Sequence, residues 1–522
     1  MDAFWKKVAG GFDGAPGKAE AEKLAAALGG AVGGTVYAES VAPAGGAVLA
    51  LVRRHLEKSF LAAWPAGKTP AVAAEFDGAR RSVTVGGAAL EILEGPRSAA
   101  NAAAVRKALP WAAPQAIGDR PSIGLGDRLG LATPGHVRAV RGTGYVPMLA
   151  QQSIREMTRT RRSAQDVMDD ATWGVFQTGF RTGFGSDADH LKTMEAIDTC
   201  AAAGFTFYTI DPGDHVDNAA DTADAVTLAT KCEALPWTAL DTTPADMLRT
   251  FTAARVALPG GRTLALDATA LLRAAAKYGH AVAHTAAMYR HLEHRLGKGR
   301  FELEVSVDET DTPTSPAEHY YVATELARLG VRWVSLAPRF VGRFEKGVDY
   351  IGDLAALEQE FADHWAVAQA CGDYKLSLHS GSDKFSVYDL AAKIAGQRVH
   401  VKTAGTSWLE ALRVLAKCEP GLFREILAFA RERYDTDKAS YHVSAQLDRI
   451  VKPESVTDAD LPAVLDQFDS REALHVTFGS VLTWDDGLRF RGRLYDALRL
   501  HEEDYAEGLR LHIGRHLKAF LA

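Results

Sequence analysis

The stretch Lys375-Leu-Ser-Leu-His-Ser-Gly-Ser-Asp-Lys-Phe385 decides how the rest of the chain is interpreted. Leu376 and Leu378 point to one face, while the lysine, the first serine and His379 point to the other, which is the two-residue period of a β-strand. A Ser-Gly-Ser turn then ends the strand. A strand with one apolar and one reactive face, ending in such a turn, is typical of a barrel strand whose carboxyl end delivers a functional group.

Short strand patterns recur along the chain and alternate with helical patterns, such as those at Ala188–Ala203, Glu318–Leu329, Leu354–Cys371 and Trp408–Lys417. Eight segments are predicted to be strands: Ser122–Gly126, Trp173–Gly179, Phe205–Ile210, Phe301–Val307, Val331–Ala337, Lys375–Gly381, Val399–Ala404 and Leu474–Ser480. Strands joined by helical crossovers indicate a parallel sheet, and eight such units predict an α/β fold of the closed (β/α)8 barrel type. An open doubly wound sheet is the alternative, disfavoured because no GxGxxG motif stands at a strand-to-helix turn.

Two parts of the chain depart from the simple barrel pattern. Residues 1–115 are rich in alanine and glycine, with helical patterns at Ala19–Leu28 and Ala47–Leu61. A hairpin is plausible within Ala71–Leu93, with Phe76-Asp-Gly-Ala79 as its turn. They carry no catalytic constellation, so we expect an N-terminal accessory α+β subdomain. Residues 116–522 are then the barrel domain. Within it, residues 217–299 separate the third and fourth predicted strands, which predicts a helical cap inserted after the third strand.

Composition argues against several function classes. A formal net charge of −7 on 522 residues gives no basis for nucleic-acid binding. No stretch approaches the ~20 apolar residues of a membrane span, and the N-terminal segment lacks the apolar run of a signal peptide. The four cysteines are far apart and form no CxxC pair, so free thiols in a reducing cytoplasm are expected. A small molecule is the expected partner, and the sequence leaves open whether the chain forms a homo-oligomer.

Strand alternation places ionisable side chains inside the predicted barrel, which branched apolar residues normally fill. These inward groups are Glu302, Glu304, Asp308, Lys375, His400, Lys402 and His475. Burying them unpaired would cost several kcal/mol each, so they must be paired, hydrated or bound to a metal. A polar site for a polar ligand explains them most simply. Glu302, Lys375 and His400 could equally form structural ion pairs near the barrel floor.

Other candidates lie at strand ends and turns. A functional role is favoured for His379, because it lies at a strand end and catalytic groups in this fold come from strand ends. His215 lies in a turn just after the third predicted strand, and function is favoured there as well. Asp127 follows the first predicted strand and fits a helix N-cap as well as a functional acid. His442 fits a surface histidine as well as a ligand.

Histidines and carboxylates at strand ends suit a divalent cation of the Zn, Mn, Co or Ni type. Inward lysines and arginines suit an anionic substrate, most simply a carboxylate. A metal, an acid/base pair and a cationic clamp together indicate enolate chemistry on a carbohydrate-like acid. The residues alone name no substrate.

Six motifs carry a resemblance to a known family. They are Phe176-Gln-Thr-Gly-Phe-Arg181, Thr209-Ile-Asp-Pro-Gly-Asp-His-Val-Asp-Asn218, Val305-Ser-Val-Asp-Glu-Thr310, Leu336-Ala-Pro-Arg-Phe-Val-Gly342, Leu376-Ser-Leu-His-Ser-Gly-Ser-Asp-Lys384 and His400-Val-Lys-Thr-Ala-Gly-Thr-Ser-Trp408. In these motifs the chain resembles the tagaturonate epimerase family. The resemblance implies a metal-dependent enzyme that interconverts D-tagaturonate and D-fructuronate by inverting C4, with neutral fructose and tagatose as further substrates.

Strand-end position and the resemblance together suggest a role for each candidate. The expected metal ligands are His215, His379 and His442. The expected acid/base residues are Glu304 as proton donor, Asp127 as its partner base and Asp308 as the reserve for either task. The expected substrate-binding residues are Gln177, Arg339, Lys384 and Lys402. C4 is β to the ketone and its C–H is not acidified, so simple deprotonation does not invert it. A retro-aldol route is favoured over a transient oxidation at C4, which would need a hydride carrier, because the sequence shows no nicotinamide-binding fingerprint.

Two alternatives stay open at this point. A class II aldolase or a ketose 3-epimerase on the same barrel would use similar groups. A sugar-acid binding protein without turnover would keep the cationic clamp but would not need a metal with paired carboxylates.

Overall fold

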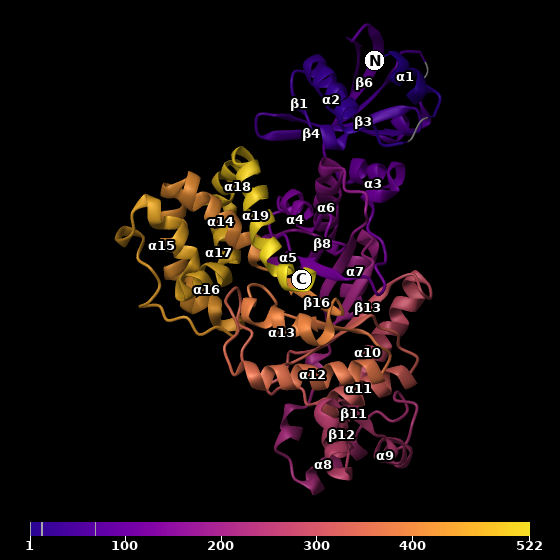
Figure 1. Cartoon of the computed structure of the whole chain (residues 1–522), viewed down its shortest axis with the longest axis vertical. Helices are drawn as coiled ribbons and strands as arrows, with labels where there is room; N and C mark the ends of the chain where they lie inside the picture. The colour runs from indigo at the N-terminus through magenta and orange to yellow at the C-terminus, as the bar shows by residue number, and fades with distance from the viewer. Residues whose placement is uncertain (1, 12–13, 68) are drawn as a thin grey trace.

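In the computed structural model, which describes residues 2–11, 14–67 and 69–522, eight parallel strands close into a barrel (Figure 1). In order around the barrel they are β7 (Ser122–Leu125), β8 (Val146–Ser153), β9 (Gly185–Leu191), β10 (Phe207–Ile210), β13 (Glu302–Val307), β14 (Ser335–Pro338), β15 (Lys375–Leu378) and β16 (Val399–Thr403). Helices cover its outer face: α4 (Thr133–Val140), α5 (Ile154–Thr160), α6 (Ala164–Thr178), α7 (Met194–Ala203), α11 (Pro316–Arg328), α12 (Leu354–Ala370) and α13 (Phe385–Ala395). The predicted (β/α)8 barrel class is confirmed.

Two of the eight predicted strands are wrong. Trp173–Gly179 forms the end of α6, and Leu474–Ser480 spans α16 (Phe468–Val476) and α17 (Phe478–Thr483), which places His475 on a helix. Both helices are buried on nearly all sides, and a short apolar run of this kind does not distinguish a buried helix from a strand. The true strands β8 and β9 were missed; all eight residues of β8 are buried, so it shows no alternation.

The cap insertion therefore follows the fourth barrel strand, β10, and not the third. It contains α8 (Ala225–Glu233), α9 (Pro244–Ala253) and a hairpin of β11 (Val256–Leu258) and β12 (Arg262–Leu264). The 29-residue α10 (Ala268–Leu296) then returns to the barrel and packs against α11. In Figure 1 the cap lies at the opposite end of the molecule from the N-terminal segment.

The N-terminal segment is built on an antiparallel sheet in the order β1-β3-β4-β6-β5, with β2 added on β3. Its strands are β1 (Thr35–Val36), β2 (Ala42–Ala44), β3 (Ala47–Arg54), β4 (Glu57–Pro65), β5 (Ala79–Val85) and β6 (Ala88–Gly95), and its helices are α1 (Asp2–Ala9), α2 (Lys18–Val32) and α3 (Ala99–Ala108). The helix predicted at Ala47–Leu61 is wrong, because this apolar run forms buried strands. A hairpin is present as β5–β6, but its turn is at Gly86 and Gly87, both at positive φ, and not at Phe76–Ala79, because Ala79 begins β5.

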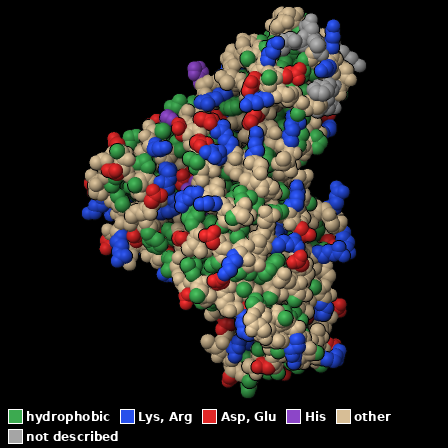
Figure 2. All heavy atoms as spheres, viewed as in Figure 1, with side chains coloured by type: hydrophobic (Ala, Val, Ile, Leu, Met, Phe, Trp, Pro, Cys, Tyr) green, Lys and Arg blue, Asp and Glu red, His purple; other side chains and the backbone are tan. Residues whose placement is uncertain are grey.

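Six helices follow the last barrel strand and gather beside the barrel, orange to yellow in Figure 1. They are α14 (Thr406–Cys418), α15 (Pro420–Asp437), α16, α17, α18 (Arg491–Leu500) and α19 (Glu502–Leu517). Their apolar side chains form a core of their own, and α19 packs on α4 of the barrel. On the face drawn in Figure 2, acidic and basic side chains are interspersed rather than gathered into one patch. Among the described residues, no helix is both long and apolar enough to cross a bilayer.

Candidate active site

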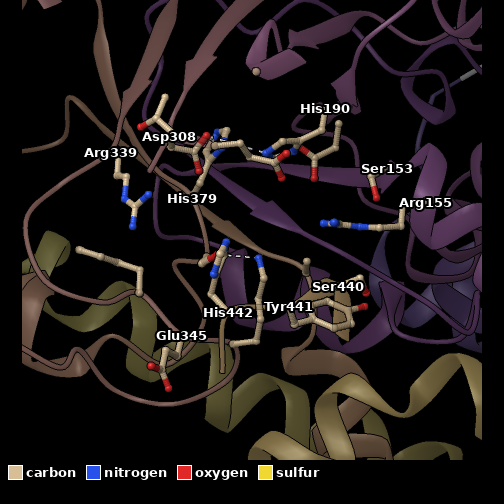
Figure 3. A pocket seen from close by; sticks show the side chains of 18 of the residues that line it. Ser153, Arg155, His190, Asp308, Arg339, Glu345, His379, Ser440, Tyr441 and His442 are labelled. Atoms are coloured by element: carbon tan, nitrogen blue, oxygen red, sulfur yellow. Dashed lines mark hydrogen bonds and ion pairs between the residues drawn. The ribbon is translucent and has the colours of Figure 1, made fainter. Parts of the chain in front are cut away.

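A cavity of about 500 Å³ opens at the carboxyl ends of the barrel strands. His190 near the end of β9, Asp308 just after β13 and His379 just after β15 point toward one another along one wall of it (Figure 3). Tyr441 and His442, from the segment after α15, lie on the other side in this view. Parallel strands bring their carboxyl ends to one edge, so residues distant in sequence meet here.

His190, Asp308 and His379 form a compact group whose potential ligand atoms all lie within 4.8 Å of one another. Asp308 Oδ1 lies 3.1 Å from His379 Nδ1 and 4.0 Å from His190 Nε2. The two imidazole rings are 4.7 Å apart between centroids. Two imidazoles and one carboxylate directed at a common point are a donor set that suits a transition-metal cation.

Buried carboxylates hold the remaining ring nitrogens of this group. His190 Nδ1 lies 2.7 Å from Asp189 Oδ1, and His379 Nε2 lies 2.7 Å from Glu304 Oε1. Metal-ligating histidines are typically oriented in this way, with a carboxylate fixing the tautomer. The residues present therefore fit a bound cation, with His190 Nε2, His379 Nδ1 and Asp308 toward it.

Without a cation the same geometry holds a proton. Burial by itself would lower the pKa of His379, but the Asp308 and Glu304 carboxylates outweigh it and raise the pKa to about 10. The protonated ring then bridges the two carboxylates. Binding a cation at Nδ1 would displace that proton.

Lys402 lies beneath the histidines and neutralises the carboxylates that orient them. Its Nζ is 2.7 Å from Asp187, 2.6 Å from Asp189 and 3.0 Å from Glu304, and it also donates to Thr209 at 2.8 Å. Burial opposes the charge, but the three carboxylates raise the pKa of Lys402 well above its usual value. Protein acceptors occupy its N–H groups, so Lys402 supports the site from below instead of contacting a substrate.

Three other cations line the cavity without a carboxylate within 4.0 Å in the part of the chain that the structure describes: Arg155, Arg339 and Lys346. Lys346 Nζ donates to Ser380 Oγ at 2.6 Å, and burial together with Arg155 lowers its pKa. The Arg155 guanidinium lies 5.6 Å from the centre of the Tyr441 ring. These cations are available to an anionic ligand.

The three expected metal-binding histidines lie in three different places in the structure. His379 belongs to the compact group. His442 lines the same cavity but is not one of the residues within 4.8 Å. His215 is exposed, and its ring stacks on His284 of α10 at 4.0 Å between centroids, because the short turn Gly213–His215 directs it toward that helix.

Asp127 has a local structural task. Its Oδ1 accepts hydrogen bonds from the backbone N–H groups of Leu129 and Gly130, at 3.0 and 2.8 Å. Its Oδ2 accepts from the N–H of Ala132 at 2.8 Å. The residue therefore fastens the loop that leads into α4. It is not the N-cap of that helix, which is Ala132, and it does not line the cavity.

Lys384 is fully buried below the cavity rim. Its Nζ donates to the backbone carbonyls of Glu345, Val348 and Ser382 at 2.8, 2.5 and 2.9 Å. These bonds hold the loop that presents Lys346 to the cavity. Burial lowers the pKa of Lys384 to about 7, and no substrate contact is open to it.

Gln177 lies on α6 instead of a barrel strand, which removes it from the cavity. Its side chain accepts from Lys58 at 2.7 Å and donates to Glu502 at 2.6 Å. These contacts join the N-terminal sheet, α6 and α19. Of the expected substrate-binding residues, Arg339 alone lines this cavity.

The three groups at the barrel floor have structural partners, but the expected ion pairs do not form among the described residues, and the partners are backbone groups and a serine. Glu302 accepts a hydrogen bond from the Ile117 backbone at 2.8 Å, and Lys375 donates to the carbonyl of Gly118 at 3.0 Å. His400 Nδ1 lies 2.9 Å from Ser122 Oγ. They close the amino-terminal end of the barrel.

His190 and Lys346 are cavity residues that sequence reasoning missed. His190 fell inside a segment interpreted as a helix, although Asp187 and Asp189 at alternate positions repeat the pattern of Glu302 and Glu304. His190 sits at φ 53°, a conformation that non-glycine residues adopt rarely and that clusters at functional sites. Lys346 lies in a loop with no periodic signal.

Comparisons with known proteins agree with the motifs. The model of the tagaturonate epimerase family matches residues 37–520. A tagaturonate/fructuronate epimerase of Thermotoga maritima is 44% identical over 421 residues, which are 81% of this chain and 85% of that protein. The crystal structure of a fructuronate-tagaturonate epimerase of Cohnella laeviribosi superposes with a TM-score of 0.86 at 37% identity, covering 96% of this chain and 98% of that one. The chain therefore belongs to the tagaturonate epimerase family.

Proposed function

We propose that this protein interconverts D-tagaturonate and D-fructuronate by inverting C4, with the cavity at the barrel mouth as its active site. The observation that carries the proposal is the meeting of two histidines and Asp308 in a cavity lined by cations without carboxylate partners. A cation-binding group beside an anion-binding wall is what a keto acid requires. The activities named for the related proteins fit this site.

His190, His379 and Asp308 would hold a divalent cation of the Zn, Mn, Co or Ni type. When bound, such a cation polarises a carbonyl and stabilises the negative charge of an enediolate. Glu304 and Asp189 fix the two imidazoles. Both Glu304 oxygens are engaged by protein groups, so Glu304 acts through His379 instead of moving a proton itself.

Inversion of C4 proceeds through a retro-aldol and aldol sequence. Removal of the proton from the C4 hydroxyl lets the C3–C4 bond break, with its electron pair passing toward the C2 carbonyl to form an enediolate. The new aldehyde turns, bond formation occurs at its other face, and the proton returns to O4. Lys346 and Ser380, beside His379, are placed to take and return this proton. Asp308 would be committed to the cation and is therefore not the reserve base.

The proposal is tested by incubating the metal-loaded protein with D-tagaturonate and separating the products by chromatography. We expect D-fructuronate as the main product, and D-fructose from D-tagatose at a lower rate. A C3 epimer, or net accumulation of three-carbon fragments, would instead indicate the 3-epimerase or the aldolase. Binding without turnover would indicate a sugar-acid binding protein.

The carbon–carbon bond cleavage has its own test. A reagent that captures aldehydes should trap the three-carbon aldehyde acid during turnover of D-tagaturonate. Absence of the trapped fragment under conditions in which the free aldehyde is captured would contradict the retro-aldol route.

Arg339 is the proposed ligand of the substrate carboxylate. Charge-assisted hydrogen bonds contribute about 1.5–3 kcal/mol, so Arg339→Leu should raise KM for D-tagaturonate roughly 10- to 150-fold with a smaller change in kcat. KM for neutral D-tagatose should stay unchanged. The matched control is Arg343→Leu, because Arg343 already pairs with Glu345 at 3.2 Å. An equal loss on the uronate and the neutral sugar would contradict this role.

A further inference from the structure

The described residues contain two more groups of potential metal ligands, both outside the cavity. One comprises Asp383, His512 and His516, and the other comprises Cys418, His501 and Asp504. Within each group the donor atoms lie within 4.8 Å of one another. The two groups differ in whether other protein atoms already occupy those donors, and that difference decides which of them is open to a cation.

The first group is closed by other interactions. Asp383 Oδ2 pairs with Arg471 at 2.8 Å. His516 Nε2 accepts the backbone N–H of Asp383 at 3.0 Å, and its Nδ1 donates to the His512 carbonyl at 3.0 Å. His516 therefore has no free lone pair, and the carboxylate is already neutralised. This group is an ion-pair network that joins the loop after β15 to α19.

The second group lies where two helix-to-helix turns meet. Cys418 is the last residue of α14 and Glu419 links it to α15. His501 links α18 to α19, and Asp504 lies in the first turn of α19. Side chains from two turns, about eighty residues apart in sequence, thus converge at one end of the C-terminal helix group.

The second group is arranged like the cavity group, with carboxylates on both sides of an imidazole, but at longer distances. His501 Nδ1 lies 3.5 Å from Asp504 Oδ2, and the Cys418 sulfur completes the group. The other nitrogen, His501 Nε2, faces the Glu419 carboxylate at 3.8 Å. One ring nitrogen toward potential ligands and the other toward a carboxylate is the usual arrangement of a metal-bound imidazole.

These donors have no competing partner among the described residues. Neither Asp504 nor Glu419 has a lysine or arginine within 4.0 Å, and no hydrogen bond engages the Cys418 thiol. Two carboxylates that face one imidazole, neither with a lysine or arginine within 4.0 Å among the described residues, favour a cation at this point.

We propose that Cys418, His501 and Asp504 form a second binding site for a divalent cation of the zinc class. Thiolate, imidazole and carboxylate are the ligand types that zinc takes in proteins, and water would complete the coordination. Binding replaces the thiol proton, which is released to solvent. The site would fasten the α14–α15 turn to the α18–α19 turn, and α14 directly follows β16, the strand that carries Lys402.

Cobalt(II) provides the test, because a cobalt–thiolate bond gives a near-ultraviolet charge-transfer band that histidine and carboxylate ligands do not give. The metal-free protein is titrated with cobalt while absorbance and bound metal per chain are measured. We expect the band in the unaltered protein, and its loss with one fewer bound cation per chain in Cys418→Ser. Zinc should raise the Tm of the unaltered protein more than that of this variant.

The matched control is Cys371→Ser, a half-buried cysteine outside any ligand group, which should keep the band and the stoichiometry. His501→Gln is a second variant that should lose the band while keeping the thiol. Epimerase turnover should stay unchanged in both variants at the second site. Absence of the band in the unaltered protein, or its persistence in Cys418→Ser, would overturn the proposal.

Discussion

Replacing His379 with alanine should remove the cation from the barrel mouth and abolish measurable epimerase turnover. His379 presents Nδ1 to the shared point with Asp308 while Glu304 holds its other nitrogen. Loss of an outer partner already costs roughly 10- to 100-fold in metal affinity or activity, so loss of the ligand itself should cost more. The measurements are bound metal per chain, turnover of D-tagaturonate by chromatography, and circular dichroism for the fold.

Two comparisons sharpen this experiment. The variant is best made together with Cys418→Ser, so that a cation at the second site is not counted. His442→Ala is the matched control, because His442 lines the same cavity outside the compact group, and it should retain the metal. Metal content and turnover that survive in His379→Ala would refute the assignment of this ligand, and loss of the metal in His442→Ala would restore His442 as one.

Replacing Lys402 with methionine should be the most destabilising single change at the site. The substitution keeps most of the volume but leaves Asp187, Asp189 and Glu304 buried without their cation. Removing one partner of a buried ion pair costs about 3–5 kcal/mol. We expect a clear fall in the Tm of the metal-free protein, measured by circular dichroism during heating. We also expect weaker metal binding, because the carboxylates no longer hold the histidines.

The stability lost in Lys402→Met should be larger at neutral pH than at acidic pH. At Asp189 and Glu304, burial is outweighed by Lys402 and the histidines, which hold the pKa well below its usual range, whereas at Asp187 burial prevails and raises the pKa to about 6. Groups with a lowered folded-state pKa stabilise the protein above their unfolded values, near pH 4, and lose this contribution as pH falls further. The difference in Tm between the unaltered protein and Lys402→Met should therefore be largest near neutral pH. It should become smaller below about pH 4.

Lys393→Met is the control for this change. Lys393 pairs with Glu358 at 2.7 Å on the surface, and exposed pairs contribute about 0–1 kcal/mol. Its Tm should barely move. A Lys402→Met protein as stable as the Lys393→Met protein would show that the buried charges are compensated in some other way.

The sequence predicts the barrel because most of its strands alternate or end in turns that carry polar groups. The strand period directs Glu304, Asp308 and His379 inward and toward one edge, and the structure brings these three side chains into contact. Their roles stay a prediction. The misassigned segment Trp173–Gly179 shows the limit of this reasoning. A helix buried on nearly all sides and a buried strand share the same apolar run, and only the packing of the whole chain separates them.

Side chains on loops were harder to place. His215 and His379 both follow strands and are alike as sequence signals, but a short turn directs His215 toward α10. Lys384 and Lys346 are a second such case. Lys384 lies in one of the family motifs but donates to backbone carbonyls, while Lys346 lies in a loop without a motif and faces the cavity. Turn geometry and long-range contacts decide such cases, and neither leaves a local pattern.

Titration of metal-free Cys418→Ser protein with zinc or manganese tests most directly whether a cation held by His190, Asp308 and His379 drives the epimerisation. Turnover of D-tagaturonate to D-fructuronate is measured against bound metal per chain. We predict that turnover rises in proportion to the cation bound and stops rising at one per chain. Full turnover in the metal-free protein, or an active protein whose cation is bound without these three residues, would contradict the account.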